Sequence, residues 1–95
     1  IATKLIGGQY DATLADSTVI GYTSAQSAGK IEQLGDTFDS APQGVAVAKD
    51  DAQLAEAIQK AMQYLMDNGY LNDILASYGA ENAALTTAAL NPSVD

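Results

Sequence analysis

The sequence is that of a short, acidic chain with a large apolar fraction. It has 95 residues, 47% of them hydrophobic, and its four Lys, no Arg and 12 Asp or Glu give a net charge of −8. This charge repels a phosphate backbone, so nucleic-acid binding is not expected. Because the chain has neither His nor Cys, the usual catalytic triads, thiol nucleophiles and zinc sites are excluded. No apolar stretch reaches the ~20 residues that a membrane-spanning helix needs.

The first half of the chain predicts a helix end, a strand and a second helix. Residues 1–6 have the apolar spacing of a helix that stops at a Gly-Gly pair. Residues 10–15 alternate between apolar and polar side chains, with the period of a strand. Asp16 follows and can cap a short helix. A further short strand is expected over residues 31–34, and residues 35–43 have the composition of a loop.

The second half predicts a buried strand followed by helices. Residues 44–49 form a continuous apolar run with two β-branched valines, which is typical of a buried strand. Asp50 is the expected N-cap of a long helix that ends at Gly69, and a second helix is expected to stop at Gly79. A weaker third helix is predicted over residues 83–90. The long helix has apolar residues at helical spacing, namely Leu54, Ile58, Met62 and Leu65.

Few residues have a pattern that supports catalysis. Asp11 and Asp16 are separated by an odd number of positions, so on a strand they face opposite sides and do not form a carboxylate pair. Ser27 and Lys30 match a Ser-x-x-Lys dyad, but Gly29 weakens the helix that such a dyad needs, and a polar loop explains these residues better. From local sequence alone, Asp16 is an ordinary helix cap.

Two segments together resemble a known family. Gly8-Gln-Tyr-Asp-Ala-Thr-Leu-Ala-Asp16 resembles the Gly-x-x-Asp-Ala-x-x-x-Asp segment of the family 3 extracellular solute-binding proteins of amino-acid ABC importers. Residues 44–79 resemble the C-terminal strand, helix, Asp-Gly turn and final helix of that family, although Gln59 and Tyr70 stand where Asn and Thr are common. The resemblance covers nearly the whole chain up to Gly79.

The resemblance implies an α/β chain, the C-terminal part of a two-lobed type II periplasmic-binding-protein fold. Residues 1–39 would be part of lobe 2, comprising a helix end, strand, helix and short strand. Residues 40–44 would be the hinge crossover, and residues 45–95 would return to lobe 1 as its C-terminal strand and helices. Whole members of the family are more than twice as long, so the resemblance implies a C-terminal fragment.

The resemblance also implies a non-enzymatic site. The carboxylate that matches Asp16 accepts hydrogen bonds from the α-ammonium of a free amino acid, and Ala15 and Gln43 match positions that approach the ligand in some members. The expected partners are the amino acid, the N-terminal portion of the same receptor and the membrane permease of an ABC importer, with no cofactor or metal. The expected location is the periplasm or the extracellular space, and the resemblance leaves open a lipid anchor on the N-terminal portion.

A second hypothesis remains open at this point. The chain is then a free-standing acidic helical domain that acts as an interaction module, or self-associates, without a small-molecule ligand. An unpaired strand such as residues 44–48 favours association. Which amino acid is bound cannot be read from these residues, because the specificity pocket of the family draws on both lobes.

Overall fold

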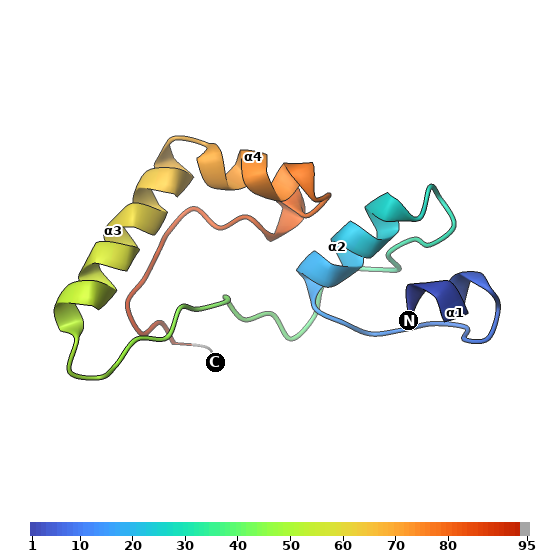
Figure 1. The fold of residues 1–95 in the computed structure, drawn as a ribbon, viewed down its shortest axis with the longest axis horizontal. Helices are drawn as coiled ribbons and strands as arrows, with labels where there is room; N and C mark the ends of the chain where they lie inside the picture. Colours follow the sequence, from blue (N-terminus) through green and yellow to red (C-terminus); the bar gives the residue numbers. More distant parts are fainter. Residues whose placement is uncertain (94–95) are drawn as a thin grey trace.

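The regular secondary structure in the part that the structure describes is helical. The computed structural model describes residues 1–93, in which long extended connections join the first three helices and a tight turn joins the third to the fourth (Figure 1). The elements in chain order are α1 (Ala2–Ile6), α2 (Ser17–Gln26), α3 (Ala52–Asp67), α4 (Tyr70–Ser77) and the short 3-10 helix η1 (Glu81–Ala83). α3 and α4 pack against each other, and η1 packs on α4.

The helix boundaries follow from glycines at the helix ends. Gly7 is the C-cap of α1, and Gly8 has a φ of 78°. Gly69 lies between α3 and α4 with a φ of 77°, and Gly79 follows α4 with a φ of 70°. Glycine adopts this left-handed conformation without the steric cost that a Cβ brings. The predicted helix ends at these three positions are therefore confirmed.

α3 begins one residue later than the sequence predicts. Its N-cap is Asp51, whose Oδ1 accepts a hydrogen bond from the backbone N–H of Leu54 at 3.0 Å. Asp50 lies in the preceding turn, so the prediction that it caps α3 is wrong. Asp50 and Asp51 both precede the helix and both carry a carboxylate, so only the backbone geometry distinguishes them. Asp51 lies three residues before the N–H from which it accepts, which is the usual spacing for an N-cap.

We expect Asp51→Ala to destabilise the first turn of α3 by about 1 kcal/mol, the usual cost of losing a capping side chain. Asp50→Ala is the matched control, since it removes the same charge from the neighbouring residue without removing the cap. Amide hydrogen exchange at Leu54 measures the difference. Equal exchange in the two variants would show that the Asp51 side chain does not stabilise this helix.

The segment after η1 is a tail that lies against α3 instead of forming a third helix. Gln63 Nε2 donates to the carbonyl of Thr86 at 3.0 Å, and Gln63 Oε1 accepts from the N–H of Ala88 at 2.9 Å. Gln59 Nε2 donates to the carbonyl of Ala88 at 3.0 Å. The predicted helix over residues 83–90 is therefore wrong beyond η1, because these backbone groups are bonded to α3 side chains and Ala84 is already extended.

Gln63→Ala is expected to release the tail, since it removes both bonds that the Gln63 amide makes to the tail. Each such bond contributes about 1 kcal/mol, so losing both should make the N–H of Ala88 exchange with solvent about thirtyfold faster. Gln59→Ala is the control, because it leaves the acceptor of the Ala88 N–H in place. Hydrogen exchange read by NMR at Ala88 checks this. If both variants accelerated exchange equally, Gln63 would not be the residue that holds the tail.

The three predicted strands do not form within residues 1–93. Residues 10–15, 31–34 and 44–49 contain no strand, and each exposes large apolar side chains; Leu14 is 83% exposed and Leu34 is 91% exposed. A strand exists only when its backbone N–H and C=O groups pair with a neighbour. The alternation and β-branched residues that predict strands describe a surface suited to a sheet, and the described residues supply no sheet for them to join.

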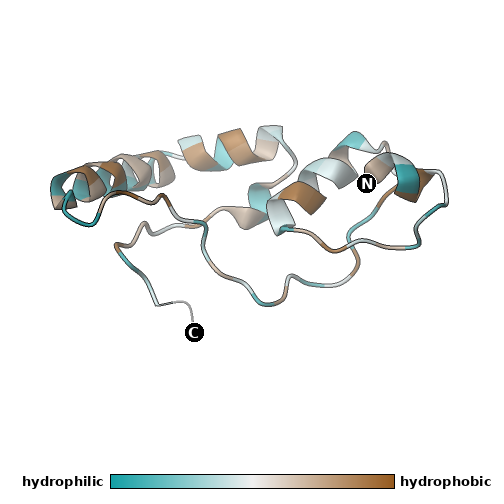
Figure 2. Cartoon of the chain, turned by 60° about the horizontal axis from the view of Figure 1, so that its bottom comes forward, coloured by the Kyte–Doolittle hydropathy of each residue, from teal (hydrophilic) through white to brown (hydrophobic). Residues whose placement is uncertain are grey.

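The structure is open, with little core. Within residues 1–93 the buried residues are Ala80, which is 5% exposed, and Ser27, which is 7% exposed. The radius of gyration is 16.3 Å, whereas a compact domain of this length has about 12 Å. The accessible surface is 7659 Å², against about 5,200 Å² for a compact protein of this mass. Apolar residues are spread along all the helices (Figure 2), so much apolar surface is left uncovered.

Candidate functional site

Asp16 stands at the start of α2, as the sequence predicts. Its backbone has a φ of −57° and a ψ of 145°, and its carbonyl accepts the N–H of Ile20 at 3.0 Å, the first hydrogen bond of the helix. The side chain makes no capping hydrogen bond and is exposed. Asp16 therefore occupies the N-cap position while its carboxylate is not used for capping, so its oxygens can accept hydrogen bonds from another molecule.

The other two residues of the predicted site lie on extended segments. Ala15 precedes Asp16 in the connection between α1 and α2, and Gln43 lies in the connection between α2 and α3; both are exposed. Ala15 stays beside Asp16 through the chain itself. No described contact brings Gln43 to Asp16. The ligand-binding roles of all three residues remain predictions.

α2 makes a close backbone contact with the turn after α4. A Cβ built on Gly21 would lie 2.7 Å from the carbonyl oxygen of Gly79, and a Cβ built on Gly79 would lie 2.6 Å from the Cβ of Ala25. Real Cβ atoms essentially never come so close to another atom. Both glycines are therefore required for this approach, and Ala80, the buried apolar residue, lies directly after it in the chain.

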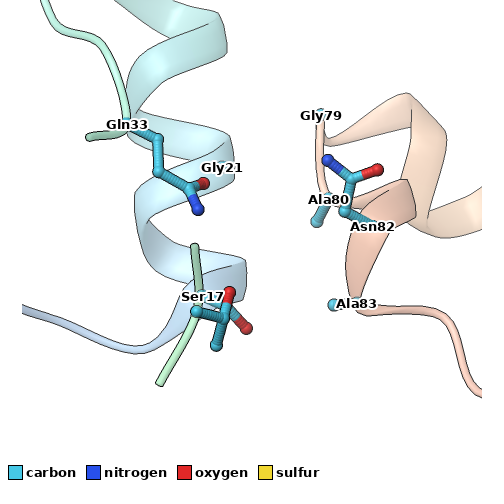
Figure 3. Close-up of a pocket in the computed structure, with 8 residues that line it drawn as sticks. Ser17, Gly21, Gln33, Gly79, Ala80, Asn82 and Ala83 are labelled. Carbon is cyan, nitrogen blue, oxygen red and sulfur yellow. The ribbon is translucent and has the colours of Figure 1, made fainter. Parts of the chain in front are cut away.

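A small polar cavity lies beside the first turn of α2 (Figure 3). It has a volume of about 40 Å³, which is room for one or two water molecules. Ligand sites for small molecules occupy ~300–1,000 Å³, so this cavity alone is not a binding site for an amino acid. Its walls come from α2, the following connection and the α4–η1 turn, namely Ser17, Gly21, Gln33, Thr37, Gly79, Ala80, Asn82 and Ala83.

An open apolar groove lies next to the polar cavity, between α2 and α4. It has a volume of about 280 Å³ and is lined by Thr18, Val19, Tyr22, Leu75, Tyr78 and Ala80. The rings of Tyr22 and Tyr78 lie with their centroids 5.9 Å apart, at 54° to each other. This lining is almost wholly apolar and offers no charged partner for an ammonium or a carboxylate.

Sequence reasoning missed the residues around the start of α2. Gln33, Thr37 and Asn82 are ordinary loop residues in the sequence, and only the fold brings them to the cavity that Ser17 also lines. Figure 3 shows Gln33 and Asn82 there. Gly21 did carry a signal, because a glycine inside a helix is unfavourable by about 1 kcal/mol and is usually kept for close packing.

Ser27 has a structural role in this chain. Its Oγ donates to the carbonyl of Ser24 at 2.8 Å and accepts the N–H of Ile31 at 3.0 Å, which holds the turn after α2. Lys30 is exposed in that turn. The hydroxyl that a Ser-Lys dyad would activate is therefore buried and bonded to backbone.

Two further properties of the described residues bear on the site. Among the helices of residues 1–93, none combines the length and apolarity needed to cross a membrane. The same residues contain no group of three acidic side chains placed to hold a metal ion.

Comparison with known proteins gives one informative match. The chain is 39% identical over 90 residues to the arginine-binding protein ArgT of Corynebacterium glutamicum, a match that covers 95% of this chain and 29% of the relative. The chain thus spans less than a third of the length of that relative. No family model and no solved structure matches it. The match to ArgT agrees with the two motif segments: over nearly its whole length the chain is similar in sequence to a family 3 amino-acid solute-binding protein.

Proposed function

We propose that this chain supplies part of the ligand site of the substrate-binding receptor of an amino-acid ABC importer. The observation that carries this proposal is the 39% identity to an arginine-binding protein over 95% of the chain. The receptor captures a free amino acid between two lobes and delivers it to a membrane permease, without catalysis. It acts in the periplasm or outside the cell.

Asp16 has the chemistry that the proposed site requires. An ammonium that is desolvated in a closing cleft needs a charged hydrogen-bond acceptor. The carboxylate of Asp16 is exposed at the N-cap of α2 and makes no capping bond, so it can accept the α-ammonium of the ligand. Ala15 and Gln43 would also approach the ligand.

Arginine is the first ligand to test, because the relative is named as an arginine-binding protein. The net charge of −8 favours the approach of a cationic amino acid over an anionic one. The site for the α-carboxylate must come from outside this chain, in keeping with a chain that spans 29% of its relative.

The proposed fold is a two-lobed α/β receptor. Residues 1–39 belong to lobe 2, residues 40–44 to the hinge and residues 45–95 to lobe 1. In the complete receptor, residues 10–15, 31–34 and 44–49 pair with strands contributed by the rest of the protein. Their uncovered apolar side chains, such as Leu14, Leu34 and Val45, support this proposal.

The open shape also weighs against a free-standing interaction module. A module that folds alone needs a hydrophobic core, yet within residues 1–93 just one apolar residue, Ala80, is buried. The accessible surface of the chain is larger than that of a compact protein of this mass by about 2,500 Å². That area is comparable to a large, obligate protein interface and supports a chain that is covered by further parts of its own receptor.

Isothermal titration calorimetry of the complete receptor tests the proposal. Arginine should bind with a 1:1 stoichiometry and a micromolar or lower Kd. Agmatine, which lacks the α-carboxylate, and glutamate, which has the opposite side-chain charge, are controls that should bind far more weakly. If none of the common amino acids bound to the folded receptor, the proposed function would be wrong.

A further inference from the structure

The contact between Gly21 and Gly79 lies on the helix that carries Asp16. Asp16 is the N-cap of α2, and its carbonyl accepts the N–H of Ile20, so it moves with the helix. Gly21 lies one turn and a half further along, about 7.5 Å along the axis at 1.5 Å per residue. Displacement of α2 at Gly21 therefore displaces Asp16.

The contact leaves no room for adjustment. A Cβ on Gly21 would lie 2.7 Å from the carbonyl oxygen of Gly79, and ordinary contact begins at 3.4 Å, so α2 and the α4–η1 turn would have to move apart by about 0.7 Å. The hydrogen bond between an ammonium and a carboxylate tolerates donor–acceptor distances of only ~2.7–3.2 Å. The required displacement exceeds this range of about 0.5 Å.

The same two glycines form walls of the polar cavity at the start of α2. Gly21 and Gly79 line it together with Ser17, the first residue of the helix, and Asn82 of η1 (Figure 3). The separation between α2 and the α4–η1 turn thus sets the width of this cavity and the position of the Asp16 backbone relative to that turn.

We infer that Gly21 and Gly79 are positioning residues for amino-acid binding: their backbone contact sets the place of Asp16. This inference rests on the proposed function, and it assigns to the two glycines an effect on ligand affinity that acts through Asp16.

A double-mutant cycle in the complete receptor tests the inference, with arginine affinity measured by calorimetry. Gly21→Ala should weaken binding about tenfold in the wild-type background, which is a loss of about 1.4 kcal/mol of binding free energy. In the Asp16→Asn background the same substitution should change affinity by less than about twofold, because the group that it displaces no longer binds. Gln26→Ala is the control, since Gln26 is an exposed residue of the same helix and lines neither cavity, and its affinity should be unchanged.

Each other outcome has a distinct meaning. An equal loss in both backgrounds would show a general structural effect and overturn the inference, as would wild-type affinity in Gly21→Ala. If Gly21→Ala does not fold, Ala25→Gly takes its place in the cycle, because it loosens the contact with Gly79 without a clash. A wild-type receptor that binds no amino acid would refute the proposed function itself, whereas a binding receptor with additive variants refutes the positioning role alone.

Discussion

Asp16→Asn should weaken amino-acid binding by the complete receptor more than a hundredfold. The substitution leaves the ligand ammonium in a closed cleft without a charged acceptor, and breaking such a pair costs about 3 kcal/mol or more. Calorimetry with arginine measures the loss. An unchanged affinity would show that Asp16 does not bind the ligand and is only the N-cap residue of α2.

The structure makes this test clean, because the Asp16 side chain makes no capping bond. Replacing it should leave the helicity of α2 and the thermal unfolding of the receptor nearly unchanged. Loss of affinity can then be separated from loss of folding. Asp11→Asn is the matched control: it removes the same charge from the same exposed connection, and arginine should bind to it as to the wild type.

The helices could be predicted from the sequence because the information that forms them is local. The apolar spacing of Leu54, Ile58 and Met62 and the glycines at the helix ends act within a few residues of the helix. Even the error at Asp50 was one of a single residue. The start of α2 at Asp16 is predictable for the same reason, and the structure has Asp16 as the N-cap of that helix.

Features that depend on distant residues could not be predicted in this way. The tail lies against α3 because Gln59 and Gln63 bond to the backbone of residues more than twenty positions away, and no local pattern indicates this. The contact of Gly21 with Gly79 is of the same kind. The predicted strands are absent from residues 1–93 for a related reason, since alternation shows which residues suit a sheet while pairing requires another segment.

The family resemblance added what local patterns could not. Local sequence alone explains Asp16 best as a helix cap. Its predicted ligand role depends on the family resemblance of two segments, the one that ends at Asp16 and the later one over residues 44–79. The identity to ArgT over 95% of the chain supports that step at the level of the family. The identity does not test the ligand-binding roles of Ala15 and Gln43, which in the proposed receptor depend on how the two lobes close.

The isolated 95-residue chain should bind arginine more than a thousandfold more weakly than the complete receptor, so that calorimetry detects no binding at millimolar ligand. A site must enclose ~70–90% of its ligand to hold it tightly. The polar cavity beside α2 has about 40 Å³, and the larger groove between Tyr22 and Tyr78 is open and apolar. Neither encloses an amino acid.

The control is the same chain mixed with the separately produced remainder of the receptor, which should restore binding by covering the exposed apolar faces of α2, α3 and α4. Small-angle X-ray scattering gives an independent measure, because the isolated chain should keep a radius of gyration of at least 16.3 Å, well above the ~12 Å of a compact domain. Micromolar binding of arginine by an isolated, compact monomer would contradict the proposal that this chain forms only part of the site. In that case the apolar surface would be covered by a rearrangement of the chain itself, and the carboxylate of Asp16 would have to be enclosed by residues 1–95 alone.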